Sequence, residues 1–136
     1  MAETLKLEIV TPEEKIYSED VEMVTLPGSE GELGIYPNHV PLMTQVHAGE
    51  IIVNREGTEE VLAVGEGFVE VTSNQVAILT DNAANSADID EAAADEARRK
   101  AENRLNEGDI SEEEAKILNQ AILYSAAQIK AKRRRG

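Results

Sequence analysis

The sequence predicts a β + α protein, in which an antiparallel β-sandwich of short strands is followed by a two-helix hairpin. Over roughly the first 80 residues, apolar and polar side chains alternate, which is the period of half-buried strands. Turn-forming residues interrupt this part at short intervals, as they do in sandwiches and barrels. Near Ala83 the β-branched residues thin out, and Ala, Glu and Arg, which favour helices, replace them.

Four apolar runs in the first part have the alternating pattern of strands, and they lie at residues 5–9, 51–53, 69–71 and 76–78. Five groups of Gly, Pro, Asn or Ser-type turn residues separate such runs, at residues 27–29, 37–38, 55–57, 65–67 and 73–74. Two sheets that face each other would bury the apolar side of every strand in one core. We therefore expect the sandwich to occupy residues 1–86.

The first helix is expected over residues 88–106. Asp88 can cap it, and the acidic side chains of Asp90 and Glu91 suit the positive end of its dipole. Gly108 is a natural stop. One narrow apolar stripe recurs every four residues, formed by Ile89, Ala93, Ala97, Ala101 and Leu105.

The second helix is expected to begin at Ser111, which forms a capping box with Glu114. Its apolar stripe consists of Ala115, Leu118, Ile122, Ser125 and Ile129. The short break between the helices predicts an antiparallel hairpin over residues 87–136. Alanine buries little surface, so we expect this hairpin to be held weakly and released at low cost.

Charge is distributed unevenly along the chain. Residues 1–86 hold 16 acidic and 3 basic side chains, a net charge of −13, whereas residues 87–136 hold 11 and 10, a net charge of −1. The acidic first part argues against nucleic acid as a partner. The last residues form a basic end, which would suit an acidic surface or be a solvated terminus: Lys130, Lys132, Arg133, Arg134 and Arg135.

No residue pattern typical of a catalytic site is present. The chain has no cysteine, and His39 and His47 lack partners at the spacing of a zinc site, so no metal site is predicted. Neither a phosphate-binding loop nor a nucleophile elbow occurs. The sequence also has no apolar run long enough to span a membrane, and its polar first residues lead us to expect no signal peptide. A protein-binding module with a helical arm is favoured over an enzyme.

Three segments resemble the epsilon subunits of F-type ATP synthases of the bacterial and chloroplast type. They are the Gly-Glu-Leu-Gly-Ile-Tyr-Pro-Asn-His segment that opens residues 31–44, the Gly-Glu-Gly-Phe-Val segment that opens residues 65–80, and the first strand at residues 5–12. The resemblance extends over the whole chain. It implies a sandwich of about ten strands. It also implies a non-catalytic rotor subunit that couples proton transport to ATP synthesis. Such a subunit would be a peripheral protein at the cytoplasmic face of a bacterial plasma membrane. A standalone binding module is the alternative.

The resemblance also implies partners for each part. The sandwich would contact the gamma subunit and the membrane-embedded c-ring, with Glu30, Gly31, Glu32 and His39 in the contact region. Glycines permit close approach, and acids could pair with basic loops, although the same glycines could serve turn geometry alone.

The helical hairpin would be regulatory in such a subunit. Extended into the alpha-beta head, it would restrain ATP hydrolysis, with the basic end facing an acidic segment of the beta subunit. Some family members bind ATP on the folded hairpin through an arginine, but Ala93 occupies that position here. Asp90, Arg98 and Arg99 could substitute only in part, so weak binding or none is expected.

Overall fold

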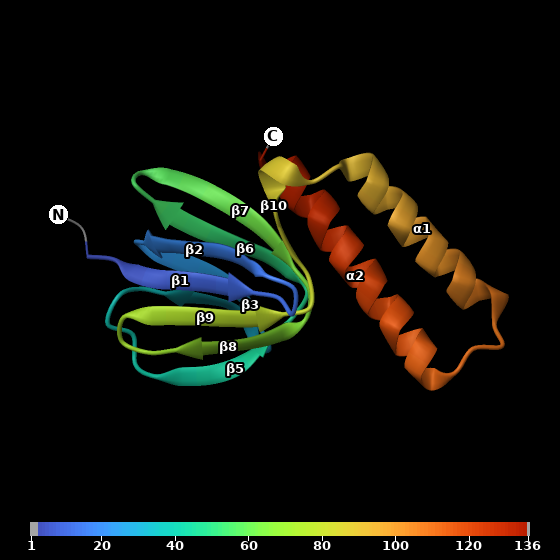
Figure 1. The fold of residues 1–136 in the computed structure, drawn as a ribbon, viewed down its shortest axis with the longest axis horizontal. Helices are drawn as coiled ribbons and strands as arrows, with labels where there is room; N and C mark the ends of the chain where they lie inside the picture. Colours follow the sequence, from blue (N-terminus) through green and yellow to red (C-terminus); the bar gives the residue numbers. More distant parts are fainter. Residues whose placement is uncertain (1–2, 136) are drawn as a thin grey trace.

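The computed structural model describes residues 3–135 and consists of ten strands followed by a short 3₁₀ turn and two helices (Figure 1). The strands are β1 Leu5–Val10, β2 Lys15–Val21, β3 Met23–Gly28, β4 Gly31–Ile35, β5 Leu42–Val46, β6 Gly49–Arg55, β7 Thr58–Val64, β8 Gly67–Val71, β9 Gln75–Thr80 and β10 Ala83–Asn85. The helical elements are η1 Ser86–Asp88, α1 Glu91–Glu107 and α2 Glu112–Arg135. The predicted fold class, a sandwich of about ten strands and a helical hairpin, is confirmed.

All ten strands belong to one continuous sheet that folds over on itself. The strand order is β10-β7-β6-β3-β5-β8-β9-β1-β2, and β4 pairs only with β3. Strand β3 joins the two layers, because its first half pairs with β6 and its last residue, Gly28, pairs with Val46 of β5. The two layers enclose the core, and β4 is left with a free edge.

The core consists of the side chains that point between the layers. The predicted alternation is confirmed in β1, where Leu5, Leu7 and Ile9 are buried and the residues between them are not. The same holds at the other predicted runs, whose buried members are Ile51, Val53, Val69, Val71, Val76 and Ile78. Since each of these strands buries only one face, its register in the sandwich is specified by burial.

One pair of neighbouring strands is parallel rather than antiparallel. Strand β1 runs beside β9 in the same direction, with Lys6 opposite Gln75 and Val10 opposite Leu79. This differs from the predicted all-antiparallel sandwich. The difference arises because the β1–β2 hairpin and the β8–β9 hairpin join side by side through their first and last strands, and this pairing has no signature in local sequence.

The first helix begins later than predicted. Asp88 lies in the 3₁₀ turn and does not cap α1; the capping residue is Asp90, whose carboxylate accepts a hydrogen bond from Ala93 N at 3.2 Å. Between them Ile89 is extended and buried. Because Ile89 packs in the cluster beneath α2, the chain cannot become helical before Asp90.

The apolar stripe of α1 also differs from the predicted one. Ala94 and Ala101 are the buried residues of α1, whereas Ala93 and Ala97 are exposed. The prediction holds at Ile89 and Ala101, which are buried, and at Leu105, which is half-buried, and it fails at Ala93 and Ala97. The prediction of Gly108 as the stop is confirmed, because Gly108 follows the helix with a positive φ of 72°.

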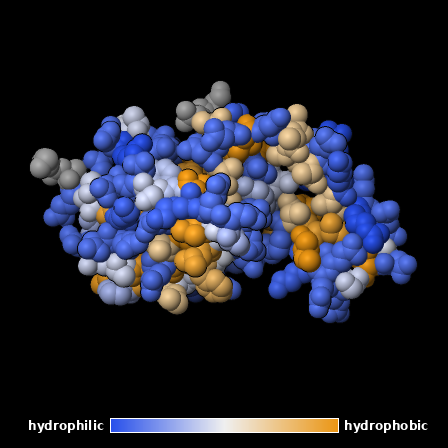
Figure 2. All heavy atoms as spheres, viewed as in Figure 1, coloured by the Kyte–Doolittle hydropathy of each residue, from blue (hydrophilic) through white to orange (hydrophobic). Residues whose placement is uncertain are grey.

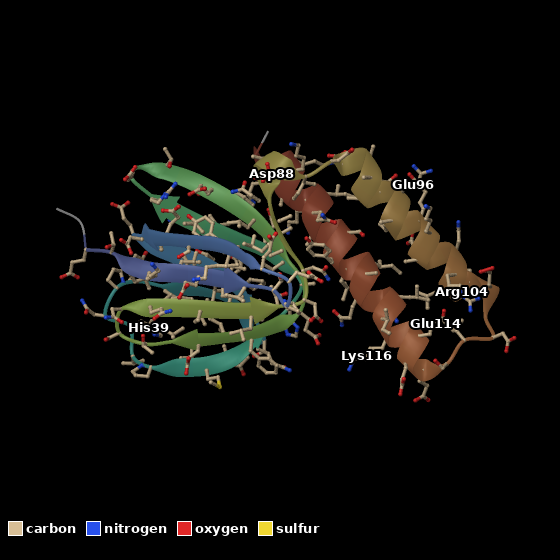
Figure 3. The ribbon with its side chains drawn as sticks, in the orientation of Figure 1. His39, Asp88, Glu96, Arg104, Glu114 and Lys116 are labelled. Carbon is tan, nitrogen blue, oxygen red and sulfur yellow. The ribbon has the colours of Figure 1, made fainter. Side chains whose placement is uncertain are left out.

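Ser111 caps α2 as predicted, since its hydroxyl accepts a hydrogen bond from Glu114 N at 3.0 Å. The Glu114 carboxylate instead accepts hydrogen bonds from Arg104 of α1, at 3.1 Å from Nε and 3.3 Å from Nη2. Arg104 and Glu114 approach each other near the inter-helix turn in Figure 3, and so fasten the antiparallel hairpin at that end.

Helix α2 is the middle layer of the molecule, between the sandwich and α1 (Figure 1). The predicted stripe is buried or half-buried on one side of α2 and includes Leu118, Ile122 and Ser125. On the opposite side, Ala127 and Ala131 pack against Val61 and Ala63 of β7 with the half-buried Tyr124 and Ala84, in a cluster separate from the sandwich core. The arm is therefore docked through a small cluster in which alanine side chains pack with the larger Tyr124 and Ile89.

Candidate functional site

The outer face of the sandwich carries an exposed apolar patch on β5, β8 and β9. The relative exposure of Met43 is 68%, that of Phe68 57% and that of Leu79 56%. Phe68 stands opposite Leu79 across the β8–β9 ladder. In Figure 2 apolar atoms gather over this part of the sheet. Exposed apolar patches of this kind mark interaction sites.

A depression of about 440 Å³ lies within this patch and extends it. Val10 and Pro12 form part of its wall together with Phe68 and Leu79, and Gln45 lies at its side. The exposed lining is mainly apolar, although Glu66 and Asp81 also line the depression. The depression is suited to receive an apolar side chain of a protein partner.

Sequence reasoning missed this patch, although a signal for it was present. Val69, Val71, Val76 and Ile78 define the inward phase of β8 and β9, so Phe68 and Leu79 occupy the outward phase. Large apolar residues at outward positions of two paired strands indicate an interaction surface.

The residues predicted to contact the c-ring are divided between the two ends of β4. Glu30, Gly31 and Glu32 lie at the tip of the β3–β4 hairpin, where Gly28 pairs with Gly31. Gly31 has a φ of 111°, which only glycine adopts readily, so turn geometry by itself requires this residue. The hairpin tip lies at the end of the sandwich nearest the arm, and the charge of Glu32 contributes to raising the pKa of Arg134.

His39 lies at the opposite end of the sandwich, remote from the arm (Figure 3). Its Nδ1 is 2.7 Å from the carbonyl oxygen of Val40, and the neighbouring Asn38 amide N donates to the carbonyl of Ser73 in the β8–β9 turn. The structure therefore does not gather the four predicted residues at one point. They share only the free edge of β4 and the loop that follows it.

The basic end of α2 lies against the sandwich. Arg134 donates two hydrogen bonds to Glu50 of β6, from Nε to Oε2 at 2.8 Å and from Nη2 to Oε1 at 3.4 Å. Lys130 Nζ lies 3.6 Å from Glu50 Oε1. The Glu50 side chain is only 6% exposed, so this carboxylate is nearly removed from water. The hydrogen bond to Glu50 is the main cause that raises the pKa of Arg134.

Two further residues of the basic end also have partners in the docked arm. Arg133 donates to both carboxylate oxygens of Glu91 in α1, at 3.3 and 3.1 Å. Lys132 Nζ donates to the carbonyl oxygen of Ser86 at 3.3 Å. The side chain of Arg135, which the sequence analysis placed in this set, lies outside the described residues.

Sequence reasoning missed both Glu50 and Ser86. Glu50 follows a glycine at the start of an ordinary strand, and nothing in the local pattern distinguishes it from the other acidic residues. Ser86 is fully buried at the junction of sandwich and arm, and its hydroxyl has no hydrogen-bond partner among the described residues.

A groove of about 390 Å³ runs between the two helices and is lined by Asp95, Arg98, Ile129, Lys130 and Arg133, together with Ala126. Of the residues considered for ATP binding, only Arg98 lines it. Asp90 is engaged in capping α1, while Arg99 bonds to Asp95 at 2.7 Å.

The groove cations are already partly neutralised. Arg98 donates to Asp95 and to Glu102, at 2.5 and 2.6 Å. The hydrogen bond from Arg98 to Asp95, followed by the one from Arg99, lowers the pKa of Asp95. Among residues 3–135, no set of three or more acidic or histidine side chains converges as a metal site. No helix in the same range is long and apolar enough to cross a bilayer.

Comparison with known proteins agrees with this architecture. Residues 4–86 match the family described as ATP synthase, Delta/Epsilon chain, beta-sandwich domain. The ATP synthase epsilon chain of Pelotomaculum thermopropionicum is 47% identical over 102 residues, covering 75% of this chain and 76% of the relative. The ATP synthase epsilon chain of Desulforamulus reducens is 42% identical over 106 residues, covering 78% and 80%.

Two solved structures have a similar fold. A chain of the Euglena gracilis mitochondrial ATP synthase superimposes with a TM-score of 0.74 at 24% identity, covering 94% of this chain and 81% of that one. A chain of the Tetrahymena thermophila mitochondrial ATP synthase central stalk and c-ring superimposes with a TM-score of 0.61 at 12% identity, covering 96% and 98%. With the sandwich matched over most of its length and relatives above 40% identity, the chain belongs to the delta/epsilon family of ATP synthase subunits, as an epsilon chain.

Proposed function

We propose that the protein is a non-catalytic rotor subunit of the central stalk, which links proton transport to ATP synthesis and restrains ATP hydrolysis through its helical arm. The exposed apolar patch on the sandwich, which a monomer would leave in water, is the observation that carries this proposal. As part of a peripheral assembly, it would work at the cytoplasmic face of a bacterial plasma membrane.

The gamma subunit would dock on the apolar patch. Phe68 and Leu79 offer a paired apolar anchor beside a depression, which is the arrangement expected at the centre of a protein interface. The surface lies on the sandwich alone, so docking would leave the arm free to move.

The c-ring would contact the β3–β4 hairpin. Glu30 and Glu32 supply exposed negative charge there, and Gly31 allows close approach of the backbone. Because β4 separates Glu32 from His39, a contact that includes both would run along the free edge of this strand.

The basic end of α2 would bind an acidic segment of the beta subunit when the arm extends into the alpha-beta head. Lys130 and Arg134 lie one helical turn apart and so can reach the same acidic site. Complementary charge of this kind sets the encounter rate and the orientation more than it sets the affinity.

ATP would bind to the arm at most weakly. The groove between the helices presents Arg98, Lys130 and Arg133, which favours an anion. The arginine of the nucleotide-binding relatives is replaced by Ala93, and Arg98 is held by two carboxylates. A phosphate would have to compete with both of them.

The proposal is tested by measuring association with purified gamma subunit for the full chain, for residues 1–86, and for Leu79→Gln. We expect the first two to bind equally and Leu79→Gln to bind at least about tenfold more weakly, since loss of a central interface anchor costs about 2 kcal/mol or more. Val40→Gln, at an exposed apolar residue near His39, is the matched control and should bind normally. If neither the full chain nor residues 1–86 binds gamma, a standalone binding module is the better description.

The same three chains should then be titrated into the ATP synthase head lacking its epsilon subunit. Inhibition of hydrolysis by the full chain, and none by residues 1–86, would assign restraint to the arm. Equal inhibition by both would move regulation into the sandwich and contradict the proposal.

A further inference from the structure

We propose that Glu50 is an internal latch that keeps the arm docked by occupying the cations that an acidic partner would otherwise bind. The inference deepens the proposed function, on which its competitive part rests. Its structural part, that Glu50 holds the arm against the sandwich, depends only on the isolated chain.

The latch has a defined geometry. The Glu50 carboxylate accepts both hydrogen bonds of the Arg134 fork, at 2.8 and 3.4 Å, and lies 3.6 Å from Lys130 Nζ. Planar two-point pairing of arginine with a carboxylate is among the stronger ionic contacts in proteins. These contacts join β6 to the last turns of α2, which are 84 and 80 residues further along the chain.

Burial makes the carboxylate dependent on these cations. The Glu50 side chain is 6% exposed, while Arg134 is 42% and Lys130 73% exposed. A nearly dry carboxylate without a cation is strongly unfavourable, so the docked arm requires the ion pair. When the arm leaves, Glu50 regains water and the two cations become available together.

The apolar part of the docked interface is a small cluster, so the latch adds to a limited area of contact. In it Ala127, Ala131 and the half-buried Tyr124 of α2 meet β7, with Ile89 beside them. It also buries the Ser86 hydroxyl without a hydrogen-bond partner, a feature that opposes docking. Glu50 and Ser86 therefore act in opposite directions on the same equilibrium.

Docked and extended states exclude each other through these residues. Arg134 and Lys130 cannot pair with Glu50 and with an acidic segment of another subunit at once. Glu50 thus competes, within the same chain, with the partner that the basic end would bind. A ligand that binds only one of two states shifts the equilibrium toward that state.

The absence of native cysteine allows a direct test. Ser73→Cys in the β8–β9 turn and Asn103→Cys on the exposed side of α1 would carry spin labels in the full chain, and the label-to-label distance distribution would report docking. In this background we expect Glu50→Gln to raise the ratio of undocked to docked arm about tenfold or more, because a charged hydrogen-bonded pair is lost.

Three further variants make this test specific. Arg134→Gln should undock the arm as Glu50→Gln does, which provides a second test if the buried substitution disturbs the sandwich. Ser86→Ala should lower the undocked-to-docked ratio about fivefold, since it removes the unpaired hydroxyl. Glu13→Gln, at an exposed acid in the β1–β2 loop, removes the same charge and should leave the distances unchanged.

The competitive part is tested with the assembled ATP synthase head. Glu50→Gln should inhibit hydrolysis more strongly than the unaltered chain, whereas Arg134→Gln should inhibit less strongly, although both undock the arm. Unchanged distances in both Glu50→Gln and Arg134→Gln would overturn the latch. If both variants undock but the unaltered chain neither binds gamma nor inhibits, the latch stands and the proposed rotor function fails.

Discussion

At the scale of single residues, Gly67 of β8 is the glycine of the sandwich at which an added side chain would have the least room. A Cβ atom built on Gly67 would lie 2.0 Å from the carbonyl oxygen of Leu79, which belongs to the backbone and cannot move aside. Gly65, two residues earlier, has no neighbour closer than 3.7 Å at the same position. The two glycines of this turn therefore serve different purposes.

We expect Gly67→Ala to lower the free energy of unfolding by about 3 kcal/mol, the upper part of the range for overpacking, because β8 would have to move away from β9. Urea unfolding would measure the loss. Gly65→Ala is the control and should change the stability by less than about 1 kcal/mol. Equal stabilities of the two variants would show that the close approach at Gly67 is relaxed easily.

Tyr17 of β2 is part of a buried polar contact across the sandwich. Its hydroxyl donates to Glu60 of β7 at 2.9 Å, and Arg55 bridges Glu60 to Glu19 at 3.3 and 2.9 Å. Burial first, and the hydrogen bond to Glu60 second, raise the pKa of Tyr17 above its ordinary value. The folded state therefore favours the protonated phenol.

The raised pKa of Tyr17 makes the folded protein less stable as the pH becomes alkaline. The stabilisation from Tyr17 is fully present below the unfolded-state pKa of about 10 and is lost as the pH rises above it. Tyr17→Phe should lower stability at pH 7 by about 1–2 kcal/mol and make the decline between pH 10 and 11.5 shallower. Urea midpoints across this pH range would measure both effects, and a decline of unchanged slope would contradict the assignment.

Sequence reasoning identified inward-facing residues well and functional residues poorly. Burial follows a period of two, so Leu7 or Ile78 can be assigned from neighbours in the same strand. Glu50 acquires its role from residues 80 and 84 positions away, and no local pattern contains that information. Phe68 is intermediate between these cases. Once Val69 and Val71 are assigned to the core, the alternation along β8 places the Phe68 side chain on the outer face.

At the scale of elements, the start of α1 shows how tertiary packing shifts a helix boundary. Asp88 and Asp90 are both good caps, and sequence alone favoured the first of them. Burial of Ile89 under α2 fixes an extended residue between them and leaves Asp90 as the cap. In the first turns of this helix Ala94, rather than the predicted Ala93, is the buried alanine.

The two aspartates therefore differ in a testable way. Asp90→Ala should destabilise α1 by about 1 kcal/mol, because the hydrogen bond to Ala93 N is lost, whereas Asp90→Asn should retain most of the capping. Asp88→Ala should have an effect below about 0.5 kcal/mol. Amide hydrogen exchange of α1 in the full chain would rank the three variants. Faster exchange in Asp88→Ala than in Asp90→Ala would indicate that Asp88 caps the helix, as the sequence predicted.

At the scale of the whole molecule, the two parts have separate apolar clusters. The large cluster lies entirely between the layers of the sandwich, and the small one lies beneath α2. The sandwich should consequently remain folded without the arm. Hydrophobic alternation and helix signals were sufficient to predict the fold class, strands followed by two helices, but not the docked position of the arm, which depends on side-chain contacts between distant segments.

A chain ending at Ser86 should give a dispersed amide spectrum like that of the sandwich in the full protein. Chemical shift differences should be concentrated in β6, β7 and β10, which lie against or beside α2, and in the β7–β8 turn, where Glu66 accepts a hydrogen bond from Gln120 of α2. An amide NMR correlation spectrum of both chains makes the comparison. Poor dispersion of the amide chemical shifts in the shorter chain would mean that the arm is required for folding.

The parallel pairing of β1 with β9 has a consequence for how the protein is made. The first strand to leave the ribosome can form its hairpin with β2 at once, but its other edge stays open until residues 75–79 have been synthesised. Contacts of such long sequence separation form late and slow folding. Nascent chains shorter than this would expose the apolar residues of β1, so the sandwich should close only as the arm begins to emerge.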